Sequence, residues 1–128
     1  MNIAIVKGGS GKMRQDIAMG KHRVTADVPE VDGGEDAGPT PHDLLAAALG
    51  ACTALTLKIY SARKQWPLLD AEVTVTIDKT PELSRMTRDI RLAGPLDDEQ
   101  KARLLKVAEA CPVHKTLSGK IEIATKLV

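Results

Sequence analysis

Residues 38–66 read GPTPHDLLAAALGACTALTLKIYSARKQW and decide the fold. Thr40 is a suitable N-cap, and Pro41 suits the first helical position because its missing N–H would have no partner there. The 14 residues from Leu44 to Leu57 carry no charge. The pattern predicts a helix over 41–65, which would be roughly 37 Å long at 1.5 Å per residue.

This long helix is expected to be buried. Its uncharged run is shorter than the roughly 20 residues that a membrane span needs, so we expect no membrane partner. Because the helix is apolar on all sides, it should be covered by a sheet and by a second copy of the chain. Asp43 follows Thr40 at capping-box spacing, and Lys58, Arg63 and Lys64 favour the negative end of the helix dipole.

The remaining segments predict strands and two shorter helices. Alternation of apolar and polar residues predicts strands at 2–7, 12–19, 22–28, 71–78, 84–92 and 120–127, the last with Ile121, Ile123 and Leu127 inward. Helical signals mark 97–110 and 112–117, and residues 29–39 predict a surface loop. Segregated strands with few helices indicate an α+β fold, an antiparallel sheet with a long central helix carrying Cys52.

Length and composition narrow the function classes. A chain of 128 residues predicts one domain, residues 1–128. The net charge of +1 and the 2% aromatic content argue against a nucleic-acid partner, which needs basic surface or stacking faces. Two cysteines without a signal peptide predict a reducing cytoplasmic compartment.

Arg88 falls on the apolar face of the strand predicted at 84–92. A buried arginine needs a partner. It is therefore either a residue near the sheet end, whose long side chain reaches solvent, or a residue of a functional site.

The two cysteines lie in different local settings. Cys111 precedes Pro112 and is expected at the N-cap of a short helix, where the dipole and free N–H groups stabilise a thiolate, with His114 one turn on. Cys52 lies three turns inside an apolar helix, which would raise its pKa. Local physics therefore favours Cys111 as the reactive thiol, and Cys52 would need a cation from outside its helix.

Metal and cofactor alternatives are weaker. Cys111 and His114 form a C-x-x-H motif, and His42 and Cys52 would bring the count to the four N/S ligands of a structural zinc site. No second paired motif at metal spacing accompanies it. The C-x-x-C-H haem motif and the full phosphate-loop motif are also absent. We expect no metal and no cofactor.

The helix stretch at 38–68, followed about 45 residues later by CPVHKTL at 111–117, resembles the osmotically inducible protein C / organic hydroperoxide resistance (OsmC/Ohr) family. The resemblance implies an intertwined homodimer and thiol peroxidase chemistry. The residue matching Cys52 would attack an organic hydroperoxide and become a sulfenic acid. The residue matching Cys111 would resolve it as a disulfide, which a dithiol would reduce.

The resemblance also implies an arginine–carboxylate pair that lowers the pKa of the first cysteine. Asp43 is the nearest match to the carboxylate, and Arg14 or Arg23 from the opening strands could supply the cation. Asp43 precedes Cys52 by nine residues, roughly 14 Å along one helix, so it would serve the thiol of the partner subunit. The alternative is a non-enzymatic dimer that senses redox state or binds a small ligand.

Overall fold

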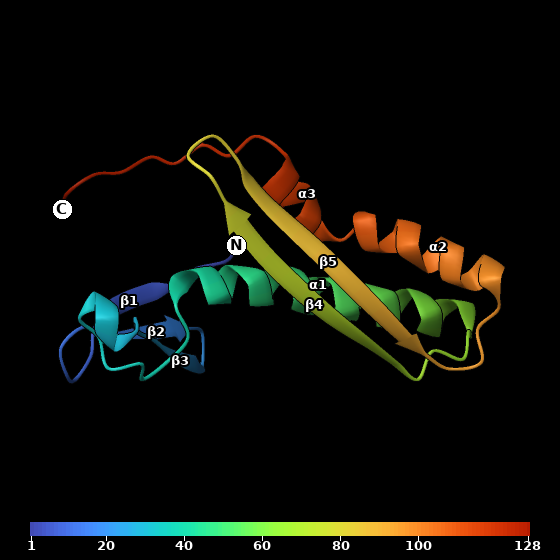
Figure 1. Ribbon diagram of the computed structural model, residues 1–128, viewed down its shortest axis with the longest axis horizontal. Coiled ribbons are helices and arrows are strands. Elements are labelled where there is room, and N and C mark those ends of the chain that lie inside the picture. The colour runs from blue at the N-terminus through green and yellow to red at the C-terminus, as the bar shows by residue number, and fades with distance from the viewer. The chain divides into compact units, whose positions relative to one another are not determined.

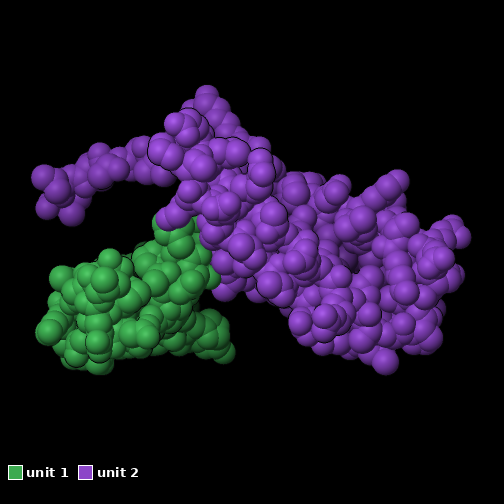
Figure 2. Space-filling view, in the orientation of Figure 1, with its two compact units in different colours: residues 1–45 green, residues 46–128 purple.

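The computed structural model describes residues 1–128, and it confirms an α+β fold with antiparallel sheets and a long helix that carries Cys52 (Figure 1). The elements in chain order are β1 (Ile5–Gly8), β2 (Gln15–Met19), β3 (His22–Ala26), the short 3-10 helix η1 (Glu30–Asp32), α1 (Pro41–Lys64), β4 (Asp70–Lys79), β5 (Ser84–Ala93), α2 (Asp98–Glu109) and α3 (Pro112–Ser118). The contacts divide the chain into two compact units, residues 1–45 and 46–128, which Figure 2 shows in different colours.

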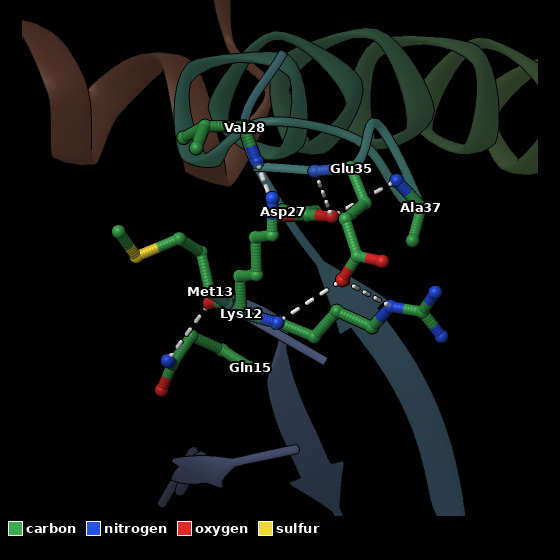
Figure 3. A network of polar contacts seen from close by, with 8 residues as sticks. Lys12, Met13, Gln15, Asp27, Val28, Glu35 and Ala37 are labelled. Atoms are coloured by element: carbon green, nitrogen blue, oxygen red, sulfur yellow. Dashed lines mark hydrogen bonds and ion pairs between the residues drawn. The ribbon is translucent and has the colours of Figure 1, made fainter. Parts of the chain in front are cut away.

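The first unit carries a three-stranded antiparallel sheet in the order β1-β2-β3. Met19 pairs with His22, so Gly20 and Lys21 form the predicted tight turn, and Gly20 has the positive φ of 61° that such turns require. The acid-rich loop after β3 is held by the buried Asp27. Its carboxylate accepts hydrogen bonds from the backbone N–H groups of Val28, Glu35 and Ala37 (Figure 3).

The second unit is built on the β4–β5 hairpin, in which Val75 pairs with Arg88 and Val73 with Ile90. Leu57 of α1 belongs to a buried cluster that also holds Ala71 of β4 and three residues of α2. The cluster consists of Leu57, Ala71, Leu96, Leu104, Val107 and Ala108. A Cβ at Gly50 would lie 3.5 Å from Val75, so a small residue at this point of α1 suits its approach to the hairpin.

Helix α1 buries one stripe, with Leu49, Thr53, Leu57 and Ser61 spaced four residues apart. The opposite side of the helix is open within one chain, where Leu55 is 59% exposed and Ile59 is 51% exposed. Cover by a second copy stays a prediction. By length and composition α1 could cross a membrane, and the core helix of a globular protein meets the same test.

The strand predicted at 120–127 is wrong. These residues form no regular element, and Ile121, Ile123 and Leu127 are exposed rather than inward. A strand exists through hydrogen bonds to a neighbouring strand, and residues 120–127 pair with neither of the two sheets. Alternation of side chains therefore indicated a strand for a segment that joins no sheet of this chain.

Candidate functional site

The two cysteines meet where α1 passes the start of α3. Cys52 is half-buried, Cys111 has no exposed surface, and both are free thiols. The Cys52 side chain is among the neighbours that lower the pKa of Cys111. Sequence alone left open whether the two side chains approach each other, and the effect of Cys52 on the pKa of Cys111 makes them neighbours.

Cys111 occupies the N-cap of α3, as its sequence context predicted. Pro112 stands at the first turn, and the extended backbone of Cys111 (φ −63°, ψ 143°) is typical of a cap. The backbone N–H of His114 donates to Cys111 Sγ at 3.3 Å. The sulfur thus receives a hydrogen bond in the position where a cap oxygen usually does.

Arg88 extends from the middle of β5 to this thiol. Its Nη1 donates to Thr53 Oγ1 at 3.0 Å and lies 3.9 Å from Cys111 Sγ. Its Nη2 lies 2.9 Å from Nδ1 of His114. The structure therefore favours the site alternative for Arg88 over the sheet-end alternative, because the residue stands opposite Val75 within the strand.

Thr53 joins α1 to the guanidinium. It is fully buried, and its hydroxyl donates to the Leu49 carbonyl at 2.7 Å. The same oxygen accepts from Arg88 and lies 3.8 Å from Cys111 Sγ. A hydroxyl has one hydrogen and two lone pairs, so this oxygen can serve all three neighbours only by turning its hydrogen toward one acceptor at a time.

The environment favours a thiolate at Cys111. Burial raises the pKa of the Cys111 thiol. Hydrogen bonds from the His114 N–H, the Thr53 hydroxyl and the Cys52 thiol lower it, and the positive charge of Arg88 lowers it further. The lowering contributions prevail, and the pKa of Cys111 lies below its usual value.

The proposed supporting residues have other contacts. The Asp43 carboxylate accepts from the Thr40 N–H at 2.9 Å, and the Asp43 N–H donates back to Thr40 Oγ1 at 3.1 Å, which confirms the capping box. The backbone hydrogen bond from Thr40 holds the pKa of Asp43 below its usual value. Arg14 Nε lies 3.8 Å from Glu35 Oε1, and Arg23 donates to the carbonyls of Gly20 and His22.

A pocket of about 610 Å³ opens on the guanidinium side of the thiols. Its polar lining consists of Arg88, His114, Glu109, Ser84 and Ser118. The apolar lining comes from α1, β5, α2 and α3 and consists of Leu49, Met86, Ile90, Leu105, Ala108 and Leu117. The arrangement suits a molecule with an apolar body and a polar group directed at Arg88.

Sequence reasoning missed Thr53 and left the role of Arg88 open between two alternatives. A signal existed for Thr53, because it is the polar member of the stripe formed with Leu49 and Leu57 at four-residue spacing. Arg88 carried a clearer signal, since its parity placed a charge on the apolar face of its strand.

Comparison with known proteins agrees with this fold. A sequence model of OsmC-like proteins matches residues 33–126. Proteins with curated descriptions include no match to the chain. The family model covers both cysteines, Arg88 and His114.

Solved structures share the architecture at low sequence identity. An OsmC-like protein from Mycoplasma pneumoniae is 17% identical with a TM-score of 0.80, covering 93% of this chain and 88% of that one. An organic hydroperoxide resistance protein from Legionella pneumophila is 24% identical with a TM-score of 0.68, covering 93% and 90%. An organic hydroperoxide resistance protein from Bacillus subtilis is 21% identical with a TM-score of 0.63, covering 93% and 91%.

Proposed function

Because the chain belongs to the OsmC-like family, we propose that it is a thiol-dependent peroxidase that reduces organic hydroperoxides. Two proteins of similar fold are named for organic hydroperoxide resistance, which supports the substrate class. The observation that carries the proposal is the pair of neighbouring free thiols, Cys52 and Cys111, beside the guanidinium of Arg88.

Cys52 is the thiol that attacks the peroxide. It is half-buried whereas Cys111 has no exposed surface, so a peroxide reaches Cys52 first. The Cys52 thiolate attacks the O–O bond, the alkoxide leaves and takes a proton to become the alcohol, and Cys52 becomes a sulfenic acid.

Cys111 then resolves the sulfenic acid. Its thiolate attacks the Cys52 sulfur, hydroxide leaves and takes a proton to become water, and a disulfide joins the two residues. A dithiol returns both to the reduced state. The proximity of the two side chains supports this step.

A cytoplasmic homodimer completes the proposal. The exposed apolar side chains Leu55 and Ile59 on the long helix support a second copy of the chain as their cover. Asp43, with Arg14 or Arg23, would then serve the thiol of the partner subunit. Residues 1–128 would act as one domain, since α1 runs across the boundary between the two compact units.

Thiol counting with cumene hydroperoxide tests the activity. One equivalent should remove both free thiols of the wild-type chain, measured after an acid quench and unfolding so that the buried Cys111 is counted. Cys52→Ser should keep its single thiol, whereas Cys111→Ser should lose one thiol to a sulfenic acid that dimedone traps. Peroxide consumption by Cys52→Ser at the wild-type rate would refute the assignment.

The pocket beside Arg88 favours a second candidate, a non-enzymatic dimer that binds a small ligand with an apolar body or senses redox state. The rate of thiol loss in the same experiment distinguishes the peroxidase from the non-enzymatic protein. Thiol loss that is no faster than that of unfolded protein, together with saturable binding of a nonreactive apolar acid, would favour the binding role.

A further inference from the structure

We propose that Arg88, supported by Thr53 and His114, holds the Cys111 sulfur as a thiolate and thereby makes Cys111 the leaving group when a Cys52–Cys111 disulfide is reduced. The reduction step rests on the proposed function, and the thiolate itself does not. Arg88 comes from a strand, while the two cysteines come from helices, so the hairpin supplies a cation that neither helix carries at this point.

The contacts of Arg88 direct its charge at the sulfur. Nη1 lies 3.9 Å from Cys111 Sγ. Arg88 forms none of the ion pairs of the chain, which join Arg14 to Glu35, Lys58 to Asp70 and Lys120 to Glu122. Its hydrogen-bond partners, Thr53 and His114, are not carboxylates. Glu109 lines the same pocket, but no carboxylate lies within ion-pair distance of Arg88, so the guanidinium charge is available to a nearby thiolate.

His114 fixes the orientation of the guanidinium. Arginine can only donate, so the contact between Arg88 Nη2 and His114 Nδ1 requires Nδ1 to be an unprotonated acceptor. The backbone N–H of the same residue donates to Cys111 Sγ. His114 therefore acts as a positioning residue that holds the cation on one side while its own N–H meets the sulfur.

The hydroxyl hydrogen of Thr53 can change its acceptor when the Cys111 sulfur changes its charge. In the thiol state its hydrogen points to the Leu49 carbonyl, 2.7 Å away. In the thiolate state the hydrogen can turn to Cys111 Sγ at 3.8 Å while the oxygen still accepts from Arg88. The thiolate thus gains a hydrogen bond without any movement of heavy atoms.

A low-pKa thiol leaves a disulfide faster than an ordinary one, so the site directs reduction. A thiolate of the incoming dithiol attacks Cys52 Sγ and forms a mixed disulfide there. The Cys52–Cys111 bond breaks, and Cys111 Sγ keeps the electron pair as a thiolate beside Arg88. The second thiol of the reductant then attacks the reductant sulfur that is bonded to Cys52. This step closes a cyclic disulfide within the reductant and releases Cys52, which takes up a proton and is again a thiol.

Titration of the thiolate absorbance near 240 nm tests the cation without peroxide or disulfide. In the Cys52→Ser background, Arg88→Met should shift the titration of Cys111 upward by about one pH unit or more, as expected for the loss of an adjacent opposite charge. Arg88→Lys should shift it less because the charge remains. Arg85→Met is the matched control, an exposed arginine on the other face of the same strand, and should leave the titration unchanged.

Thr53→Val covers the case in which Arg88→Met does not fold, because valine nearly preserves the shape and removes the hydroxyl. It should also shift the titration upward. Unchanged titrations in every folded variant, or equal shifts in Arg88→Met and Arg85→Met, would overturn the proposal.

The direction of reduction is tested separately on wild-type protein oxidised with diamide. A limiting amount of glutathione, quenched with acid, should give a mixed disulfide at Cys52, and the attack rate should fall in Arg88→Met. Glutathione found on Cys111, or an unchanged rate, would overturn the leaving-group assignment, whereas failure of the chain to consume hydroperoxide would refute only the proposed peroxidase activity.

Discussion

Replacing Leu57 with alanine should destabilise the second compact unit strongly. Leu57 has no exposed surface and packs in one cluster with Ala71 of β4 and Leu104 and Ala108 of α2. Side chains from three elements surround it, so the structure has little freedom to close the cavity. The expected cost in unfolding free energy is about 3 kcal/mol, within the range measured for buried leucine-to-alanine changes.

Thermal unfolding converts this cost into a measurable shift. At an unfolding entropy of about 2.1 cal/mol/K per residue, a loss of about 3 kcal/mol lowers the Tm of a chain of this length by about 11 °C. Calorimetry at one fixed protein concentration is the suitable assay, because a dimer's Tm depends on concentration.

Leu69→Ala is the matched control for Leu57→Ala. Leu69 follows the same helix but is 74% exposed, so its truncation should change the Tm by no more than about 2 °C, as for an ordinary surface substitution. The assignment of the core would be refuted by equal Tm shifts in the two variants, or by a shift under about 3 °C for Leu57→Ala.

Two further predictions concern the first unit and the oligomeric state. Hydrogen bonds from the backbone N–H groups of Ala37, Val28 and Glu35 hold the pKa of Asp27 below its usual value, although burial opposes them. Asp27 therefore stabilises the fold above its unfolded pKa of about 4, and this stabilisation is lost as the pH falls through the lower folded pKa. Asp27→Asn should therefore lower the Tm at pH 7, and the gap from wild type should narrow below about pH 4; a constant gap would contradict this account. Leu55→Asp should convert the proposed homodimer to a monomer in sedimentation, and a wild-type chain that sediments as a monomer with full activity would contradict the proposed homodimer.

Local signals predicted the elements whose partners lie nearby in the chain. Thr40, Asp43 and Pro41 gave the start of α1, and strict alternation from Ala71 to Asp78 gave most of β4. The N-cap position of Cys111 also followed from Pro112 alone. Each of these depends on hydrogen bonds or side-chain directions within a few residues, which a sequence displays directly.

Features that depend on distant partners could not be predicted in the same way. Alternation at 120–127 indicated a strand, but a strand also needs a sheet edge, and no local pattern reveals one. The role of Arg88 required knowing that β5 lies beside both Thr53 and the Cys111 cap. Parity placed the charge on the inner face but could not say which groups it would meet there.

The position of Arg88 within the hairpin constrains how β4 and β5 may pair. The turn that sets their pairing is closed by hydrogen bonds between Thr80 and Leu83. Because side chains alternate, a slip of β5 by one residue would bring Thr87 or Asp89 to the place of Arg88. With Thr87 in that place, the Cys111 thiol would lose its cation. With Asp89 there, it would face a carboxylate, which disfavours a thiolate. The turn between β4 and β5 thus fixes the strand register that keeps the positive charge of Arg88 beside the Cys111 sulfur.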